Sequence, residues 1–178
     1  SGYRLIIEQY WGLVELGFFA VGFQLAGQVF ALAESLSTQF LYPLFFREVS
    51  ENEKSEIVSS AYSDLLNTLV PLYFILTGAV ILSATSLLKI LVATQFHGAM
   101  LFVMLGAGVE LCRVLGNLLS NAAHIKRKTL HLVLPYATGA IISISLIYLA
   151  GAWSMSILWA GVALIVGASS MLITMWKI

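Results

Sequence analysis

The chain has 178 residues, of which 60% are hydrophobic and only 10% are charged, and its formal net charge is zero. Soluble domains carry about 25% charged residues, so this composition excludes a water-soluble surface and predicts an integral membrane protein. Zero net charge argues against a nucleic-acid partner. The single cysteine, Cys112, excludes a disulfide framework and a cysteine-based metal site, and we expect no metal and no cofactor.

The first segment lacks an initiator methionine and a signal-peptide pattern, and we interpret residues 1–14 as the end of a truncated transmembrane helix. The chain is therefore expected to be a fragment of a larger transporter. Tyr10 and Trp11 suit a membrane interface, which places Arg4 about 10 Å inside it at 1.5 Å per residue. Arg4 either pairs with Glu8 one turn away or lines a cavity as a cation.

The first complete transmembrane helix is expected over residues 16–44. Most of its polar residues lie within about 60° of one helical face: Gln24, Gln28, Ser35 and Gln39. Glu34 lies on a neighbouring face near the middle of the membrane. An ionisable residue at that depth is functional by default, although a carboxyl group that is protonated or paired between helices would explain it equally well.

Polar residues follow this helix, and Pro43 is expected to end it. Ser50-Glu51-Asn52-Glu53 matches a capping box. This pattern predicts a short amphipathic helix from Glu51 through Asp64 along the membrane surface. The next transmembrane helix is expected over residues 65–92, where Pro71 would act as a static kink or, in a transporter, as a hinge.

The helix expected over residues 99–123 carries a second polar stripe. Its polar residues fall within about 100° of one face, together with His124 just after its end. They are Glu110, Arg113, Asn117, Ser120 and Asn121. Because the rest of this helix is apolar, the stripe is expected to face inward, to a cavity or to other helices. Glu110 and Arg113, three residues apart, also suit a local ion pair, but a pair made only for neutrality does not require the rest of the stripe.

Two further transmembrane helices are expected over residues 130–152 and 154–176. Neither contains an acidic residue, a lysine or an arginine, so both are interpreted as scaffold. Ala163 and Gly167 form a small-xxx-small pair suited to close helix packing. The fold class is thus an all-α, polytopic transmembrane bundle, with residues 15–178 forming five transmembrane helices of one lobe.

Basic residues predict the topology. A cytoplasmic Lys126–Lys128 loop puts most of them on the cytoplasmic side, in agreement with the positive-inside rule: Arg47, Lys54, Lys126, Arg127, Lys128 and Lys177. Only Lys89 falls on the opposite side. The C-terminus is then cytoplasmic in a multi-pass protein of the lipid bilayer.

One stretch carries a family resemblance. Residues 14–26 read V-E-L-G-F-F-A-V-G-F-Q-L-A, and after a largely apolar run residues 42–57 read Y-P-L-F-F-R-E-V-S-E-N-E-K-S-E-I. This stretch resembles the eighth helix of polysaccharide-transport flippases, which belong to the multidrug/oligosaccharidyl-lipid/polysaccharide exporter superfamily. The matching features are Gly17 with Phe18 and Phe19, then Pro43 and Arg47 with the acidic segment. The later helices are similar in hydropathy and spacing.

The resemblance implies two six-helix lobes around a central cavity, with this chain as the C-terminal lobe of a 12-helix flippase and the missing N-terminal lobe as its partner. It implies export of a lipid-linked saccharide across a bacterial inner membrane. O-antigen flippases of lipopolysaccharide synthesis are the nearest type. Their substrates are carried on undecaprenyl-pyrophosphate, and their cavities are generally cationic. Arg4 and Arg113 match that pattern by position, whereas Glu34 and Glu110 depart from it.

The resulting hypothesis is alternating access around a midplane site. Arg4 and Arg113 would attract the pyrophosphate. Five amides would hydrogen-bond the sugar hydroxyls: Gln24, Gln28, Gln39, Asn117 and Asn121. Glu34 or Glu110 would couple transport to a proton or sodium gradient. No catalytic residue and no covalent chemistry are required.

Three alternatives remain at this stage. A multidrug/cation antiporter of the same superfamily would use the acids for the cation and the arginines for structure. A membrane-embedded glycan-lipid enzyme would need a catalytic acid or metal site, but His97, His124 and His131 are scattered and form no ligand spacing with a carboxylate. A purely structural subunit does not explain two intramembrane polar stripes.

Overall fold

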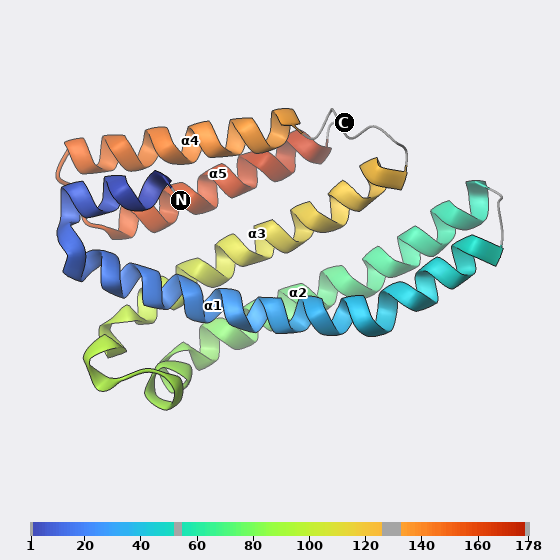
Figure 1. The fold of residues 1–178 in the computed structure, drawn as a ribbon, viewed down its shortest axis with the longest axis horizontal. Coiled ribbons are helices and arrows are strands. Elements are labelled where there is room, and N and C mark those ends of the chain that lie inside the picture. The colour runs from blue at the N-terminus through green and yellow to red at the C-terminus, as the bar shows by residue number, and fades with distance from the viewer. Residues whose placement is uncertain (1, 52–54, 126–132, 177–178) are drawn as a thin grey trace.

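The structure is a computed structural model that describes residues 2–51, 55–125 and 133–176; the side chains of residues 41–42, 44–51, 55–59, 61 and 121–125 lie outside the description. Its elements are α1 (Gly2–Glu51), α2 (Ser55–Leu91), the 3-10 helix η1 (Thr94–Ala99), α3 (Met100–Ile125), α4 (Val133–Ala152) and α5 (Leu158–Trp176) (Figure 1). The described ranges contain no strand. The all-α prediction is confirmed.

The hydropathy of the helices marks the chain as a multi-pass membrane protein. Within the described residues, five segments are long and apolar enough to cross a membrane: Gly2–Phe40, Tyr62–Leu91, Thr94–Ser120, Val133–Ala152 and Leu158–Trp176. A bilayer core needs about 20 apolar residues in a helix. The side chains that face outward from the bundle are largely apolar, as lipid contact requires; Leu82 and Ile90 of α2, for example, are 89% and 79% exposed.

Gly12 divides α1 into two helices. Its backbone has φ 85° and ψ 173°, a region that is essentially open only to glycine. Residues 2–11, the N-terminal segment, turn back to lie along α4, while residues 13–51 run across α3 (Figure 1). The indole Nε1 of Trp11 donates to the carbonyl oxygen of Met155 at 2.8 Å. The Tyr10 ring also packs edge-on against Tyr148, with centroids 5.9 Å apart.

The region after Pro43 differs from the sequence prediction. The helix does not end at Pro43 but continues to Glu51, and α2 runs without interruption from Ser55 to Leu91. A proline removes one backbone hydrogen bond and can bend a helix without ending it. The predicted separate surface helix is therefore wrong. Residues 52–54 of the capping box lie outside the described residues.

The α1–α2 hairpin is longer than a bilayer is thick. Residues 13–51 span roughly 58 Å at 1.5 Å per residue, against about 30 Å of hydrocarbon. Figure 1 shows the end of this hairpin projecting farthest from the bundle, at the end opposite Gly12. The backbone of residues 41–51 and 55–61 therefore lies on an extension of two spanning helices.

Glycines bring two helix pairs into close contact. A Cβ added to Gly22 of α1 would lie 2.5 Å from Cβ of Phe102 on α3, and one added to Gly167 of α5 would lie 2.7 Å from the carbonyl oxygen of Gly139 on α4. Ala163, one turn before Gly167, is also buried. The small-xxx-small prediction for α5 is confirmed. Buried aromatic residues such as Phe19 and Phe30 fill the space between α1, α2 and α3.

Candidate functional site

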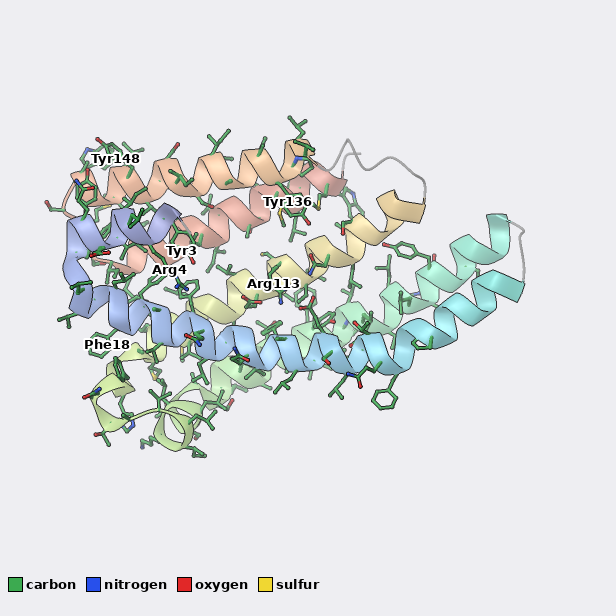
Figure 2. All side chains as sticks on the ribbon, viewed as in Figure 1. Tyr3, Arg4, Phe18, Arg113, Tyr136 and Tyr148 are labelled. Atoms are coloured by element: carbon green, nitrogen blue, oxygen red, sulfur yellow. The ribbon has the colours of Figure 1, made fainter. Side chains whose placement is uncertain are left out.

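A cluster of charged and amide side chains joins α1 to α3 within their membrane-spanning segments. The Nε atom of Arg113 donates to Oε2 of Glu110 at 2.6 Å, and its Nη2 atom donates to Oε2 of Glu34 at 2.6 Å. The Nδ2 atom of Asn117 donates to the other oxygen of Glu34, Oε1, at 3.0 Å. We call Glu34, Glu110, Arg113 and Asn117 the charged cluster; Figure 2 shows its central residue, Arg113, midway along α3.

Small residues of both α1 and α3 bring the two helices close together beside this cluster. Gly106 of α3 packs on α1, where an added Cβ would lie 3.1 Å from both the Cβ of Ala26 and the Cα of Phe23. One turn later on α3, Oε1 of Glu110 lies 3.5 Å from the position of a Cβ on Gly27. Residues three and four apart share a helical face, so Arg113 and Asn117 continue the same line toward Glu34.

The cluster carries a net charge and is partly exposed. Two carboxylates and one guanidinium give a formal charge of −1. The side chains of Arg113, Glu34 and Glu110 are 40%, 26% and 18% exposed. A charged group facing lipid hydrocarbon is unfavourable by several kcal/mol. A partly exposed charged cluster at this depth is therefore expected to face water or another polar protein surface.

Tyr73 of α2 packs against α1 at Phe30, one helical turn before Glu34. Its side chain is 3% exposed and stacks on Phe30, with centroids 6.5 Å apart and an interplanar angle of 14°. The contact of Tyr73 could not be predicted from the sequence, because a single tyrosine in an apolar span carries no periodic signal.

The amide stripe of α1 faces away from the charged cluster. Gln24, Gln28 and Gln39 are exposed, and Nε2 of Gln39 donates to Oγ of Ser35 at 3.0 Å. The buried face of α1, which includes Phe30, lies about 170° around the helix from this stripe. The polar stripes of α1 and α3 therefore do not face each other, and Glu34 is the polar residue of α1 that meets α3.

Arg4 does not join the charged cluster. It is exposed on the N-terminal segment, apart from Arg113 on α3 (Figure 2). Within the described part of the chain, Arg4 forms no ion pair or hydrogen bond, so the local Arg4–Glu8 pair is not formed. The side chain of Asn121 lies outside the described residues, and its predicted role stays a prediction.

Metal-binding geometry is not found among the described residues, which contain no group of three or more His, Cys, Asp or Glu side chains able to hold an ion. Comparison of the chain with protein-family models, with curated proteins and with solved structures finds no match. The assignment of a function therefore depends on the charged cluster, the amide stripe and the family resemblance of the sequence.

Proposed function

We propose that this chain is part of a transporter that exports a lipid-linked oligosaccharide or polysaccharide precursor across a bacterial inner membrane by alternating access. The observation that carries the proposal is the charged cluster. A partly exposed group of two acids, an arginine and an amide lies between two membrane-spanning helices. A purely structural pair of helices would be more stable with apolar residues at these positions.

The side chains divide into two kinds of substrate contact. Arg4 has no anionic partner among the described residues, so its guanidinium is available to a pyrophosphate group. Gln24 and Gln28 are exposed amides with donors and acceptors for sugar hydroxyls, and Gln39 adds a third. No covalent step is required of any of these residues.

Arg113 has a different role here from the direct substrate contact that the sequence predicted. Its guanidinium is bonded to two carboxylates, so it is not free for substrate while both remain bound. In the proposal, Glu34 or Glu110 supplies ion coupling, and Arg113, which is bonded to both, links the coupling residue to the contact between α1 and α3.

The excess acid in the cluster favours a second candidate, a multidrug/cation antiporter of the same superfamily. Two carboxylates around one guanidinium leave a formal charge of −1, which a proton or a monovalent cation would neutralise. In that case the cluster would be the cation site, and Arg4 would have no role in substrate binding.

Export assays in cells carrying the full-length protein separate the two candidates. For the flippase, Arg4→Ala and Arg113→Ala are expected to abolish surface display of the saccharide at normal protein levels, and at least one of Glu34→Gln and Glu110→Gln should be tolerated. For the antiporter, both glutamate variants lose ion-coupled efflux. Normal display in Arg113→Ala would refute the role given to Arg113.

Cysteine accessibility tests whether the polar surfaces meet water. Single cysteines at positions 24, 28, 39, 113 and 117, in a Cys112→Ala background, are treated with a membrane-impermeant thiol reagent in intact cells. Labelling at 24, 28 and 39, with none at the lipid-facing control position 82, is expected. If no stripe position labels, the stripes are helix contacts and the substrate-binding roles must be abandoned.

A further inference from the structure

Two donors on α3 converge on a single carboxylate. Nη2 of Arg113 lies 2.6 Å from one oxygen of Glu34, and Nδ2 of Asn117 lies 3.0 Å from the other. The two donors come from residues four apart, which project from the same helical face. Paired donors that each contact a different oxygen are the arrangement by which proteins bind carboxylates and phosphates. We call Arg113 and Asn117 the oxyanion cradle.

The cradle does not depend on its present occupant for its shape. Glu110 holds the Nε atom of Arg113 at 2.6 Å from within the same helix. This bond orients the guanidinium so that its Nη2 group is directed toward α1. Glu34 belongs to a different element, 79 residues away in sequence. If Glu34 leaves, the Glu110–Arg113 bond and the Asn117 amide remain together on α3.

Charge favours an exchange of ligands. With Glu34 bound, the cluster has a formal charge of −1 and would repel a second anion. Without Glu34, Arg113 and Glu110 form a neutral pair, and the cradle can accept an anion through its charged donor. The exposed fractions of Arg113 and Glu34, 40% and 26%, leave the cradle open to a ligand from solvent.

We propose that Arg113 and Asn117 form a phosphate-binding site whose internal occupant is Glu34, and that Glu34 leaves when a phosphate group binds. The proposal rests on the proposed function in that a transported lipid would bring the phosphate to this site. Phosphate binding would also change how the helices pack. The bonds of Glu34 join α1 to α3 in addition to the close packing at Gly22, so loss of these bonds allows the two helices to separate.

Two charge-matched variants test the exchange. Glu34→Gln and Glu110→Gln each remove one negative charge beside the same guanidinium, but only Glu34→Gln weakens the occupant of the cradle. Binding of inorganic pyrophosphate is measured by calorimetry on the full-length protein in lipid nanodiscs. Glu34→Gln is expected to bind it about tenfold more tightly than the wild type and distinctly more tightly than Glu110→Gln. Adding Asn117→Ala to Glu34→Gln should reverse most of the gain.

Equal pyrophosphate affinities of the Glu34→Gln and Glu110→Gln variants would overturn the proposal, because the loss of one negative charge would then explain the whole effect. Unchanged affinity in Glu34→Gln would also overturn it. If Glu34→Gln does not fold, Glu34→Ala carries the same comparison. A parallel titration with a short-chain phosphatidic acid identifies the source: a gain with both probes includes lipid headgroups among the ligands, and a gain with pyrophosphate alone assigns a free phosphate.

Saccharide display measured on the same variants separates this proposal from the transport function. Loss of display in Arg113→Ala, together with equal pyrophosphate affinities of the two glutamate variants, would refute the exchange and leave transport intact. A gain specific to Glu34→Gln with normal display in Arg113→Ala would support the exchange and refute the transport role of Arg113.

Discussion

The α1–α3 and α4–α5 pairs use the same means of close packing but have different chemistry. Gly22 lets α1 approach α3, and Gly167 lets α5 approach α4. The α4–α5 pair contains no acid, lysine or arginine in its helices, whereas α1 and α3 meet through three charged side chains. A glycine contact therefore brings membrane helices together without making a site. The site forms where α1 and α3 leave space beside Gly27, and charged side chains fill it.

The largest loss of stability is expected from filling the α4–α5 contact. In Gly167→Ala the new Cβ would lie 2.7 Å from the carbonyl oxygen of Gly139 and against Oγ of Ser143, so the helices must move apart. A loss of about 1–3 kcal/mol is expected for such overpacking, seen as a lower midpoint of thermal unfolding in detergent. Gly78→Ala is the matched control, because nothing lies within 4 Å of its added Cβ. Equal midpoints for the two variants would contradict close contact between α4 and α5.

Removing the cation from the α1–α3 contact should destabilise the protein for an electrostatic reason. Arg113→Gln leaves two carboxylates side by side, and because the arginine is 40% exposed we expect a loss of about 1–2 kcal/mol, below the value for a fully buried pair. Adding Glu34→Gln to Arg113→Gln should reverse part of the decrease in the unfolding midpoint. A double-mutant cycle on unfolding midpoints measures this coupling, and strict additivity would show that the two side chains do not interact.

A single methyl group at the junction between the N-terminal segment and the rest of α1 should lower the stability of the protein. Gly12→Ala places an L-residue at φ 85° and ψ 173°, which is unfavourable by about 1 kcal/mol or more. No atom lies within 4 Å of the added Cβ, so any loss of stability arises from the backbone conformation and not from a steric clash. Gly2→Ala, equally uncrowded and without the positive φ, should leave the unfolding midpoint unchanged; a similar shift in both variants would argue against the break at Gly12.

The smallest effect on stability is expected from the amide of the charged cluster. Asn117→Ala removes one hydrogen bond to Glu34 and should lower the free energy of unfolding by about 1 kcal/mol. Ser120→Ala removes only a local bond to the carbonyl oxygen of Asn117 and provides the control. If Ser120→Ala lowers the unfolding midpoint as much as Asn117→Ala, the bond between the helices contributes nothing specific.

The local features of the site followed from sequence, because they depend on spacing within one helix. Glu110 and Arg113 are three residues apart, and the structure confirms their ion pair. Gly167 was predicted as a packing residue from its spacing to Ala163, and it contacts α4. The membrane character followed from composition, since long uncharged segments are stable only where lipid or protein surrounds them.

The sequence by itself determined that five helices suit a membrane and that two of them carry polar stripes. Only the tertiary structure decided that Glu34 meets Arg113, that Tyr73 stacks on Phe30, and that the amide stripe of α1 faces away from α3. The physical reason is that helical periodicity fixes which side chains share a face. It does not fix which neighbouring helix that face meets, because this depends on the contacts that glycines and aromatic residues allow between elements far apart in the chain.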